Sequence, residues 1–188
     1  MRSYGLSAFA VVGVAALLFV AVRFGGLTSL STLTQNTQSS SIDEVRHSYL
    51  IAEQAPFFDL PDIMGNHARI SDFIETPLVV VFWSTWNDAA ADQIHILDQY
   101  LSRQGTQSLV KIIAIDSQEE RSVVSSFMSR GGYNVPTLID ISGSVSEAYH
   151  IKSLPTTYFI GRDGTIRDAY TGVLSESMLI NKLDQIVQ

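Results

Sequence analysis

The sequence predicts an α/β fold with a mixed central sheet and helices on both of its faces. The continuous apolar run 78–83 and a second strand-like segment, 111–116, are each followed by a segment whose apolar residues have helical spacing, which is typical of buried parallel strands joined by helices. Near the C-terminus, two short strand-like runs flank an Asp-Gly pair at 163–164, which favours an antiparallel hairpin. Parallel and antiparallel strands in one layer make the sheet mixed, and helices cover its faces.

The first 24 residues, 1–24, are predicted to form a membrane anchor. Residues 6–22 carry no charge and lie between Arg2 and Arg23, and a helix of this length, at about 1.5 Å per residue, reaches the short end of a bilayer span. A cleaved signal peptide is the alternative, although Ala21-Val22-Arg23 puts an arginine where cleavage requires a small residue. The flanking cations slightly favour a cytoplasmic N-terminus. We therefore expect a single-pass protein of the cell membrane with its domain on the extracytoplasmic side, periplasmic or extracellular.

Residues 25–53 are predicted to be a flexible linker, because 25–41 are poor in charge and rich in Ser, Thr, Gln and Asn. A short helical stretch is expected around 42–50. The globular domain is predicted to span 54–188. It begins with a small hairpin within 55–74, where prolines and a Met64-Gly65-Asn66 turn separate apolar pairs.

The strand at 78–83 is apolar throughout, which predicts burial on both faces. The helix after it has two sides with different chemistry. The residues that repeat toward the core are Ala90, Ile94, Leu97 and Leu101. The residues that share the opposite, solvent side are Asp88, Asp92, His95 and Gln99. The first strand and its helix are therefore predicted to pack through one helical stripe.

The second half of the domain is predicted as four strands and three helices. The strand at 111–116 ends in Ser117 and Glu120, a capping-box pattern that opens a helix, and Gly131-Gly132 stops that helix. A short strand at 136–139 precedes a second Ser-x-x-Glu start at 144–147. The remaining elements are the hairpin strands 156–160 and 165–169 and an amphipathic helix at 175–187.

Composition excludes several classes of function. The chain has 188 residues, with 12 Lys and Arg against 19 Asp and Glu, and its net charge of -7 argues against nucleic acid as a partner. It has no cysteine. Without a thiol there is no disulfide, no thiolate nucleophile, no Cys-ligated zinc and no thiol peroxidase chemistry.

Two motifs carry a resemblance to a known family. The first is the run from Val79 to Trp86, with a helix beginning at once; the second is Leu154 to Ile160, followed by Asp163-Gly164. With these motifs the chain, from about Gln54 to its end, resembles the thioredoxin superfamily, and most closely its membrane-tethered TlpA/ResA redoxin branch. The hairpin within 55–74 is similar to the extra N-terminal hairpin of that branch. The resemblance implies a thioredoxin-like fold and a family of thiol-disulfide oxidoreductases.

The resemblance also implies a site at which this chain departs from its family. In the family, the tryptophan that Trp86 matches is followed by a Cys-x-x-Cys pair at the helix N-terminus, across from a cis proline that Pro155 matches. Here Asn87 stands at the first cysteine position and Ala90 at the second. An amide and a methyl can neither attack a disulfide nor resolve a mixed one. We therefore expect no catalytic residue, no cofactor and no metal, and an enzymatic role is not favoured.

These residues have both structural and binding interpretations. Asn87 can be a helix N-cap, worth roughly 1 kcal/mol over alanine, with Ala90 buried in the first turn, or it can contact a ligand. Trp86 is expected at the edge of the groove beside Pro155, where an exposed aromatic can stack on a partner. The residue before the cis proline, here Leu154, offers its backbone to an extended peptide in this family. The alternative is that Pro155 only shapes the fold.

Two other residue groups have simpler interpretations. His95 with Asp88 and Asp92 shares one helix side and could hold a metal, but a solvated helix face accounts for the same pattern. A hydrolase built on Ser84, His95 and Asp98 lacks the surrounding G-x-S-x-G motif. Trp83 ends a buried strand and is expected in the core.

Three functions remain open. The leading hypothesis is a membrane-anchored extracytoplasmic protein, held through residues 6–22, that binds an extracytoplasmic protein or an extended peptide without turnover. The residues expected to form that surface are Trp86, Asn87, Asp88, Ala90, Leu154 and Pro155. One alternative is a thiol-disulfide oxidoreductase family member whose redox chemistry a partner supplies. The other is a purely structural domain of a membrane assembly.

Overall fold

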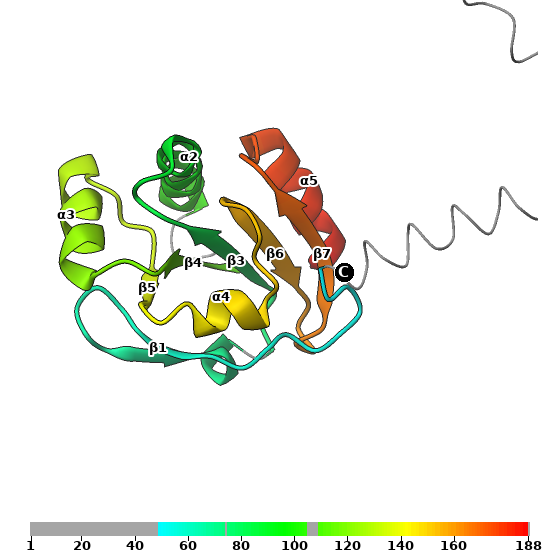
Figure 1. Ribbon diagram of the computed structural model, residues 1–188. Helices are drawn as coiled ribbons and strands as arrows, with labels where there is room; N and C mark the ends of the chain where they lie inside the picture. Colours follow the sequence, from blue (N-terminus) through cyan, green and yellow to red (C-terminus); the bar gives the residue numbers. More distant parts are fainter. Residues whose placement is uncertain (1–48, 74, 105–108, 188) are drawn as a thin grey trace, which may run out of the picture. The chain divides into compact units, whose positions relative to one another are not determined.

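The computed structural model describes residues 49–73, 75–104 and 109–187, and within them five strands form one mixed sheet in the order β5-β4-β3-β6-β7 (Figure 1). The parallel strands are β3 (Leu78–Trp83), β4 (Lys111–Ser117) and β5 (Thr137–Asp140). The antiparallel strands are β6 (Thr156–Ile160), which pairs with β3, and β7 (Ile166–Thr171). The predicted α/β fold with a mixed central sheet is confirmed.

Helices lie on both faces of this sheet. On one face lie α2 (Asp88–Gln104), α3 (Arg121–Gly131) and α5 (Glu176–Ile186). On the other face lie the short helix α4 (Ser144–Ala148) and the segment before β3 (Figure 1). Each face has its own apolar cluster, and the sheet separates the two clusters.

Strand β3 supplies side chains to both clusters, because successive side chains of a strand point to opposite faces. Val79, Val81 and Trp83 pack under the long helices, whereas the alternate residues face α4. None of its six residues is more than 2% exposed. The predicted burial of the strand on both faces is confirmed.

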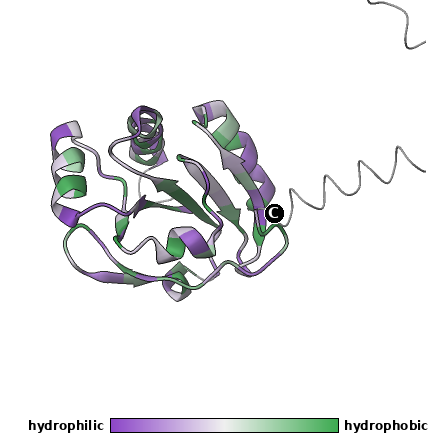
Figure 2. Cartoon of the chain, viewed as in Figure 1, coloured by the Kyte–Doolittle hydropathy of each residue, from purple (hydrophilic) through white to green (hydrophobic). Residues whose placement is uncertain are grey.

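Helix α2 packs through the predicted stripe. Ala90, Ile94 and Leu97 are fully buried, and Leu101 packs partly against the same cluster. Asp92 and His95 lie on the exposed side. The hydropathy colouring of Figure 2 shows strand β3 as hydrophobic and hydrophilic residues on helix α2. The amphipathic prediction for this helix is therefore confirmed.

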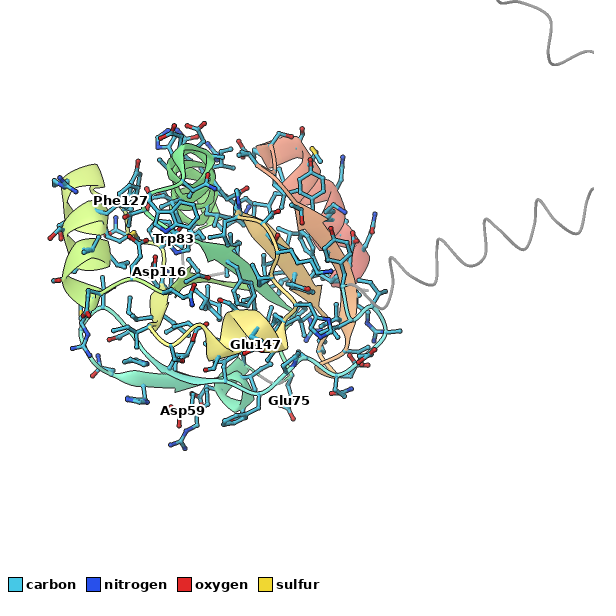
Figure 3. All side chains as sticks on the ribbon, viewed as in Figure 1. Asp59, Glu75, Trp83, Asp116, Phe127 and Glu147 are labelled. Carbon is cyan, nitrogen blue, oxygen red and sulfur yellow. The ribbon has the colours of Figure 1, made fainter. Side chains whose placement is uncertain are left out.

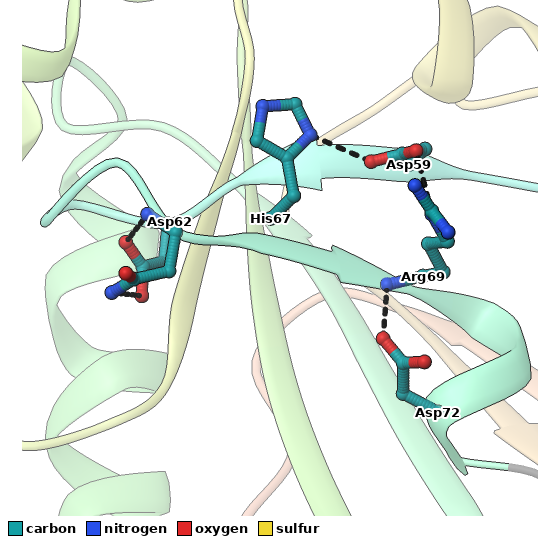
Figure 4. A network of polar contacts seen from close by, with 6 residues as sticks. Asp59, Asp62, His67, Arg69 and Asp72 are labelled. Carbon is teal, nitrogen blue, oxygen red and sulfur yellow. Dashed lines mark hydrogen bonds and ion pairs between the residues drawn. The ribbon is translucent and has the colours of Figure 1, made fainter.

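The predicted N-terminal hairpin is formed by β1 (Asp59–Pro61) and β2 (His67–Arg69), followed by the 3-10 helix η1 (Ile70–Phe73). Asp62 stabilises the turn, since its Oδ1 accepts the backbone N–H groups of Met64 at 2.8 Å and Asn66 at 2.9 Å. On the exposed side, Asp59 accepts hydrogen bonds from His67 and Arg69, and these bonds lower the pKa of Asp59 (Figure 4).

The segment before β3 also reaches both edges of the sheet. Asp62 forms an isolated antiparallel bridge with Leu138 of the edge strand β5. At the other edge, Ala52 N–H donates to the carbonyl oxygen of Ile166 at 2.9 Å, at the start of β7. The chain from 52 to 62 therefore lies along parts of both outer strands.

Both predicted capping boxes are wrong. Ser117 remains in β4, opposite Asp140 of β5, and its Oγ pairs with Ser146 Oγ at 2.7 Å. Helix α3 instead follows Glu120, whose side chain makes no capping hydrogen bond. Ser144 is already the first residue of α4, after Gly143. The pairing of β4 with β5 extends the strand through Ser117 and leaves its hydroxyl no capping role.

The other predicted termini are correct. Gly132 ends α3 in a left-handed conformation, with φ of 67°. Ser175 is the N-cap of α5 and accepts the backbone N–H of Met178. The antiparallel pairing of β6 with β7 confirms the hairpin around Gly161 to Gly164.

The predicted anchor and most of the predicted linker lie outside the described residues, as does most of the helical stretch expected around 42–50. Tyr49 and Leu50 belong to a turn. Among the residues that the structure describes, no helix is both long enough and apolar enough to cross a membrane.

Leu97→Ala is expected to lower the free energy of unfolding by about 3 kcal/mol, because truncating this fully buried side chain leaves a cavity under α2. Ile180→Ala is the control, since Ile180 on α5 is 41% exposed, and it should cost less than about 1 kcal/mol. Urea unfolding followed by circular dichroism measures both. Equal losses would contradict the packing of α2 against the sheet.

Candidate functional site

One side chain joins the start of α2 to the loop before β6. The Leu154–Pro155 peptide bond is cis. Asn87 Nδ2 donates to the carbonyl oxygen of Leu154 at 2.9 Å, and Asn87 Oδ1 accepts the backbone N–H of Ala89 at 3.0 Å. Asn87 therefore caps the helix with one end of its amide and holds the proline loop with the other. The structure brings together the two motifs that lie far apart in the sequence.

The residues expected at this surface differ in accessibility. Trp86 is 69% exposed, and Asp88 is exposed at the first turn of α2, while Asn87 and Leu154 are half-buried. Ala90 and Pro155 are buried. These two residues support the surface from behind and do not present side chains to a partner.

The backbone around the cis proline is only partly paired. The Leu154 carbonyl accepts from Asn87, and the Pro155 carbonyl accepts the Gly172 N–H at 2.8 Å. The Leu154 N–H donates to none of the described residues. An extended chain that approaches this loop can therefore use that N–H as a donor.

A second contact, which the sequence analysis missed, holds the residues before Asn87. Glu119, in the connection between β4 and α3, accepts the backbone N–H of Thr85 at 2.5 Å and the Thr85 Oγ1 hydroxyl at 2.6 Å. The register that places Trp83 opposite Asp116 brings the two segments together, because parallel strands end at the same edge of a sheet. The signal in the sequence that could have indicated this contact is the pair of acidic residues, Glu119 and Glu120, shortly after the second buried strand.

Asp116, at the end of β4, is fully buried beside Trp83 (Figure 3). No hydrogen-bond donor among the described residues reaches either of its carboxylate oxygens. Burial, with the neighbouring charge of Glu119, raises the pKa of Asp116 to about 8. The Asp116 carboxyl therefore carries a proton at neutral pH, because its charged form is disfavoured in the core.

The groups considered for metal binding and hydrolysis have other partners. His95 shares a hydrogen bond with Gln99 at 2.8 Å between their Nε2 atoms, and Asp98 accepts the Asn134 N–H at 2.6 Å. Ser84 is fully buried, and its hydroxyl has no partner among the described residues. The hydrolase arrangement is therefore not formed. In the part of the chain that the structure describes, no group of three His, Cys, Asp or Glu residues could hold a metal ion.

Comparison with known proteins identifies the family of this chain. The family model of the AhpC/TSA family matches residues 51–169. The chain belongs to the AhpC/TSA family. Within these redoxins of the thioredoxin superfamily, it is 29% identical over 168 residues to the thiol-disulfide oxidoreductase ResA of Bacillus subtilis, an alignment that covers 88% of this chain and 92% of that protein. It is 30% identical over 127 residues to ResA of Halalkalibacterium halodurans, an alignment that covers 68% of this chain and 72% of that protein.

Solved structures show the same fold. A thiol:disulfide interchange protein DsbE from Chlorobium tepidum superposes with a TM-score of 0.67 at 18% identity, over 73% of this chain and 98% of that chain. StoA from Bacillus subtilis superposes with a TM-score of 0.61 at 19% identity, over 69% of this chain and 97% of that chain. The resemblance to the TlpA/ResA branch is confirmed. This redoxin nevertheless has no cysteine anywhere in its sequence. The chain therefore has no thiol with which to carry out thiol-disulfide exchange.

Asn87→Ala is expected to lower the free energy of unfolding by about 1–2 kcal/mol, because it removes both the helix cap and the bond to Leu154. Asn181→Ala is the matched control, since Asn181 is exposed on α5, and it should change stability by no more than about 0.5 kcal/mol. Urea unfolding distinguishes the two variants. An unchanged midpoint in Asn87→Ala would contradict the bridging role.

Asp116→Asn is expected to flatten the dependence of stability on pH. The folded-state pKa of Asp116 is raised from 3.8 to about 8, so the folded protein keeps a proton that the unfolded chain loses, and this stabilisation is lost as pH rises across that window. Urea unfolding at about pH 5 and about pH 8.5 measures how much the free energy of unfolding falls between the two pH values. This fall should be smaller in the variant than in the wild type. Glu120→Gln, which removes an exposed neighbouring charge, should retain the wild-type loss. A wild-type slope in Asp116→Asn would contradict the burial of this acid in its protonated form.

Proposed function

We propose that this redoxin is a membrane-anchored, redox-inactive module that binds an extended segment of an extracytoplasmic protein. The binding edge consists of Trp86, Asp88 and the Leu154 loop. The redox reaction of the family needs a thiolate and a resolving thiol, and this chain supplies neither. What it retains is the part of the site that can recognise a chain without reacting with it.

The exposed indole of Trp86 is the observation that carries the proposal. A tryptophan that is 69% exposed places a large apolar surface in water, and such residues are enriched among those that dominate binding energy at interfaces. The residue after it, Asn87, is tied to the carbonyl of Leu154. The indole therefore belongs to the segment held against the proline loop.

Backbone pairing complements the indole. The Leu154 N–H donates to none of the described residues, whereas its carbonyl is engaged by Asn87. A partner strand can supply a carbonyl to the open N–H, while its side chains contact Trp86. This recognition requires an extended segment and no sulfur, and no part of it leads to turnover.

Membrane attachment is the second part of the proposal. The uncharged residues 6–22 between two arginines support an anchor, and the flanking charges support an extracytoplasmic domain. The partner is then a membrane or envelope protein that meets the domain on that side of the bilayer.

The likeness to ResA favours a second, related function. Those relatives are named thiol-disulfide oxidoreductases, so the module can serve in a thiol-redox complex in which the partner's cysteines carry the exchange. In that case the isolated protein still reduces no disulfide. Detectable insulin reduction by cysteine-free purified protein would contradict both functions.

Trp86→Ala is expected to weaken binding at least about tenfold, because it removes the exposed indole from the edge. A photo-crosslinking residue at position 88 should capture the partner in native membranes, and mass spectrometry would identify it. Binding of that purified partner to wild type and Trp86→Ala is then measured by calorimetry. Ile180→Ala, on α5, is the control and should bind like the wild type.

Unchanged affinity in Trp86→Ala would exclude this edge as the interface. It would favour a structural domain that uses other faces. Crosslinking from position 180 that is as efficient as from position 88 would lead to the same conclusion.

A further inference from the structure

The first half of strand β4 lacks a neighbouring strand on one side. β4 pairs with β3 from Lys111 to Asp116, but its pairing with β5 begins only at Ala114, opposite Thr137. The residue before Thr137 is Pro136, and a proline has no N–H with which to continue the ladder. Residues 111–113 of β4 therefore form an open edge within the sheet.

The peptide groups of Ile112 point toward this open edge. Backbone groups of successive strand residues alternate between the two neighbouring strands. Lys111 N–H donates toward β3, to the Pro77 carbonyl, at 2.9 Å. Ala114 N–H donates toward β5, to the Pro136 carbonyl, at 2.8 Å. Ile112 lies two residues before Ala114, so its N–H and its carbonyl face the β5 side, where neither group meets a partner among the described residues.

These two backbone groups are buried as well as unpaired. Ile112 is 3% exposed, so bulk water has little access to its peptide groups. A buried backbone donor or acceptor without a partner lowers the free energy of unfolding. A ligand that offers one acceptor and one donor, spaced as they are in a β-strand, would satisfy both groups at once.

A cavity of about 650 Å³ lies beside the open edge, and its lining is mainly apolar. The lining comes from both faces of the sheet. Leu101 of α2 and Tyr133 belong to the cluster on one face, and Ala68 of β2 and Phe73 of η1 belong to the cluster on the other. Because side chains alternate along a strand, an extended segment placed beside Ile112 would direct successive side chains toward these two faces.

The charged groups that line the cavity already have polar partners. Lys111 Nζ donates to the Asp72 carbonyl at 3.3 Å, and His67 Nδ1 pairs with Asp59 at 2.6 Å. Asp62 accepts backbone N–H groups within its own turn. The lining therefore favours uncharged side chains in a ligand.

We propose that this cavity binds a short, uncharged, apolar peptide segment that adds to β4 as a strand. A carbonyl of the segment accepts the Ile112 N–H, an N–H of the segment donates to the Ile112 carbonyl, and its side chains fill the cavity on both faces of the sheet. The segment is short because β5 occupies the same row from Thr137 onward.

The cavity is separate from the binding edge. β3 and β4 are parallel, and residues 111–113 lie at the end of the sheet where both strands begin. Trp86 follows the opposite end of β3. A peptide site at the cavity therefore goes beyond the proposed function and does not depend on it.

The first test uses the peptide N-acetyl-leucyl-leucine N-methylamide, which is uncharged and apolar. In a nuclear magnetic resonance titration, the Ile112 amide signal should shift and saturate with a Kd of about 1 mM or tighter. The same peptide with every amide N–H methylated, and the corresponding di-aspartyl peptide, should each bind at least about tenfold more weakly. An Ile112 signal that stays constant up to about 10 mM leucyl peptide, or equal binding of either control peptide, would overturn the proposal.

The second test locates the peptide. Ala68→Phe should fill the cavity and weaken binding at least about tenfold, whereas Ala148→Phe, the same change at an exposed position of α4, should bind like the wild type. Equal affinity in the two variants would contradict the site. A nitroxide-labelled leucyl peptide tests the wild type directly and requires no variant to fold. It should broaden the Ile112 amide signal, and broadening of the Trp86 indole signal in its place would overturn the assignment.

Discussion

The amide of Asn87 is the interaction on which the functional edge depends. Its oxygen accepts the Ala89 N–H and its nitrogen donates to the Leu154 carbonyl, so a single planar group fixes a helix start and a loop that lies 67 residues away in sequence. A hydroxyl or carboxylate cap satisfies the helix N–H equally well. Only a side chain with both a donor and an acceptor on one rigid plane also reaches the opposite carbonyl. The position that carries a reactive sulfur in the family carries a structural tie in this chain.

This tie changes what the site can do. In a redoxin with cysteines, the helix N-terminus stabilises a thiolate that forms and breaks bonds with its substrate. Here the helix N-terminus is satisfied internally, and the remaining accessible groups are the Trp86 indole, the Asp88 carboxylate and one backbone N–H. Each of these can bind a partner reversibly, and none can form a covalent bond with it. Under the proposed function, recognition and reaction, which the family combines, are separated in this protein.

Sequence patterns predicted most of the fold because most of it depends on local periodicity. The uniform apolar composition of β3 and the stripe of Ala90, Ile94 and Leu97 each determine burial within a single element. The capping of α2 by Asn87 was also predictable, since it involves neighbouring residues. The two failed capping boxes show the limit: Ser117 belongs to β4 because Asp140 pairs with it, and that pairing is a tertiary contact.

The polar contacts of the site were beyond sequence reasoning for the same reason. Glu119 meets Thr85 only because the register of β3 with β4 places Trp83 beside Asp116, and no local pattern encodes that register. The protonation of Asp116 likewise depends on burial by elements that are distant in the sequence. The cis proline was inferred from the resemblance alone, and the structure confirms it.

The path of the chain before β3 also affects how the protein behaves at high local concentration. A sheet with uncovered outer strands can add strands from other molecules and grow into aggregates. Here the bridge from Asp62 to Leu138 occupies part of one margin, and the Ala52 bond to Ile166 occupies the start of the other. Under the proposed membrane attachment, a domain crowded beside its own copies would thus be protected against self-association through these parts of its sheet.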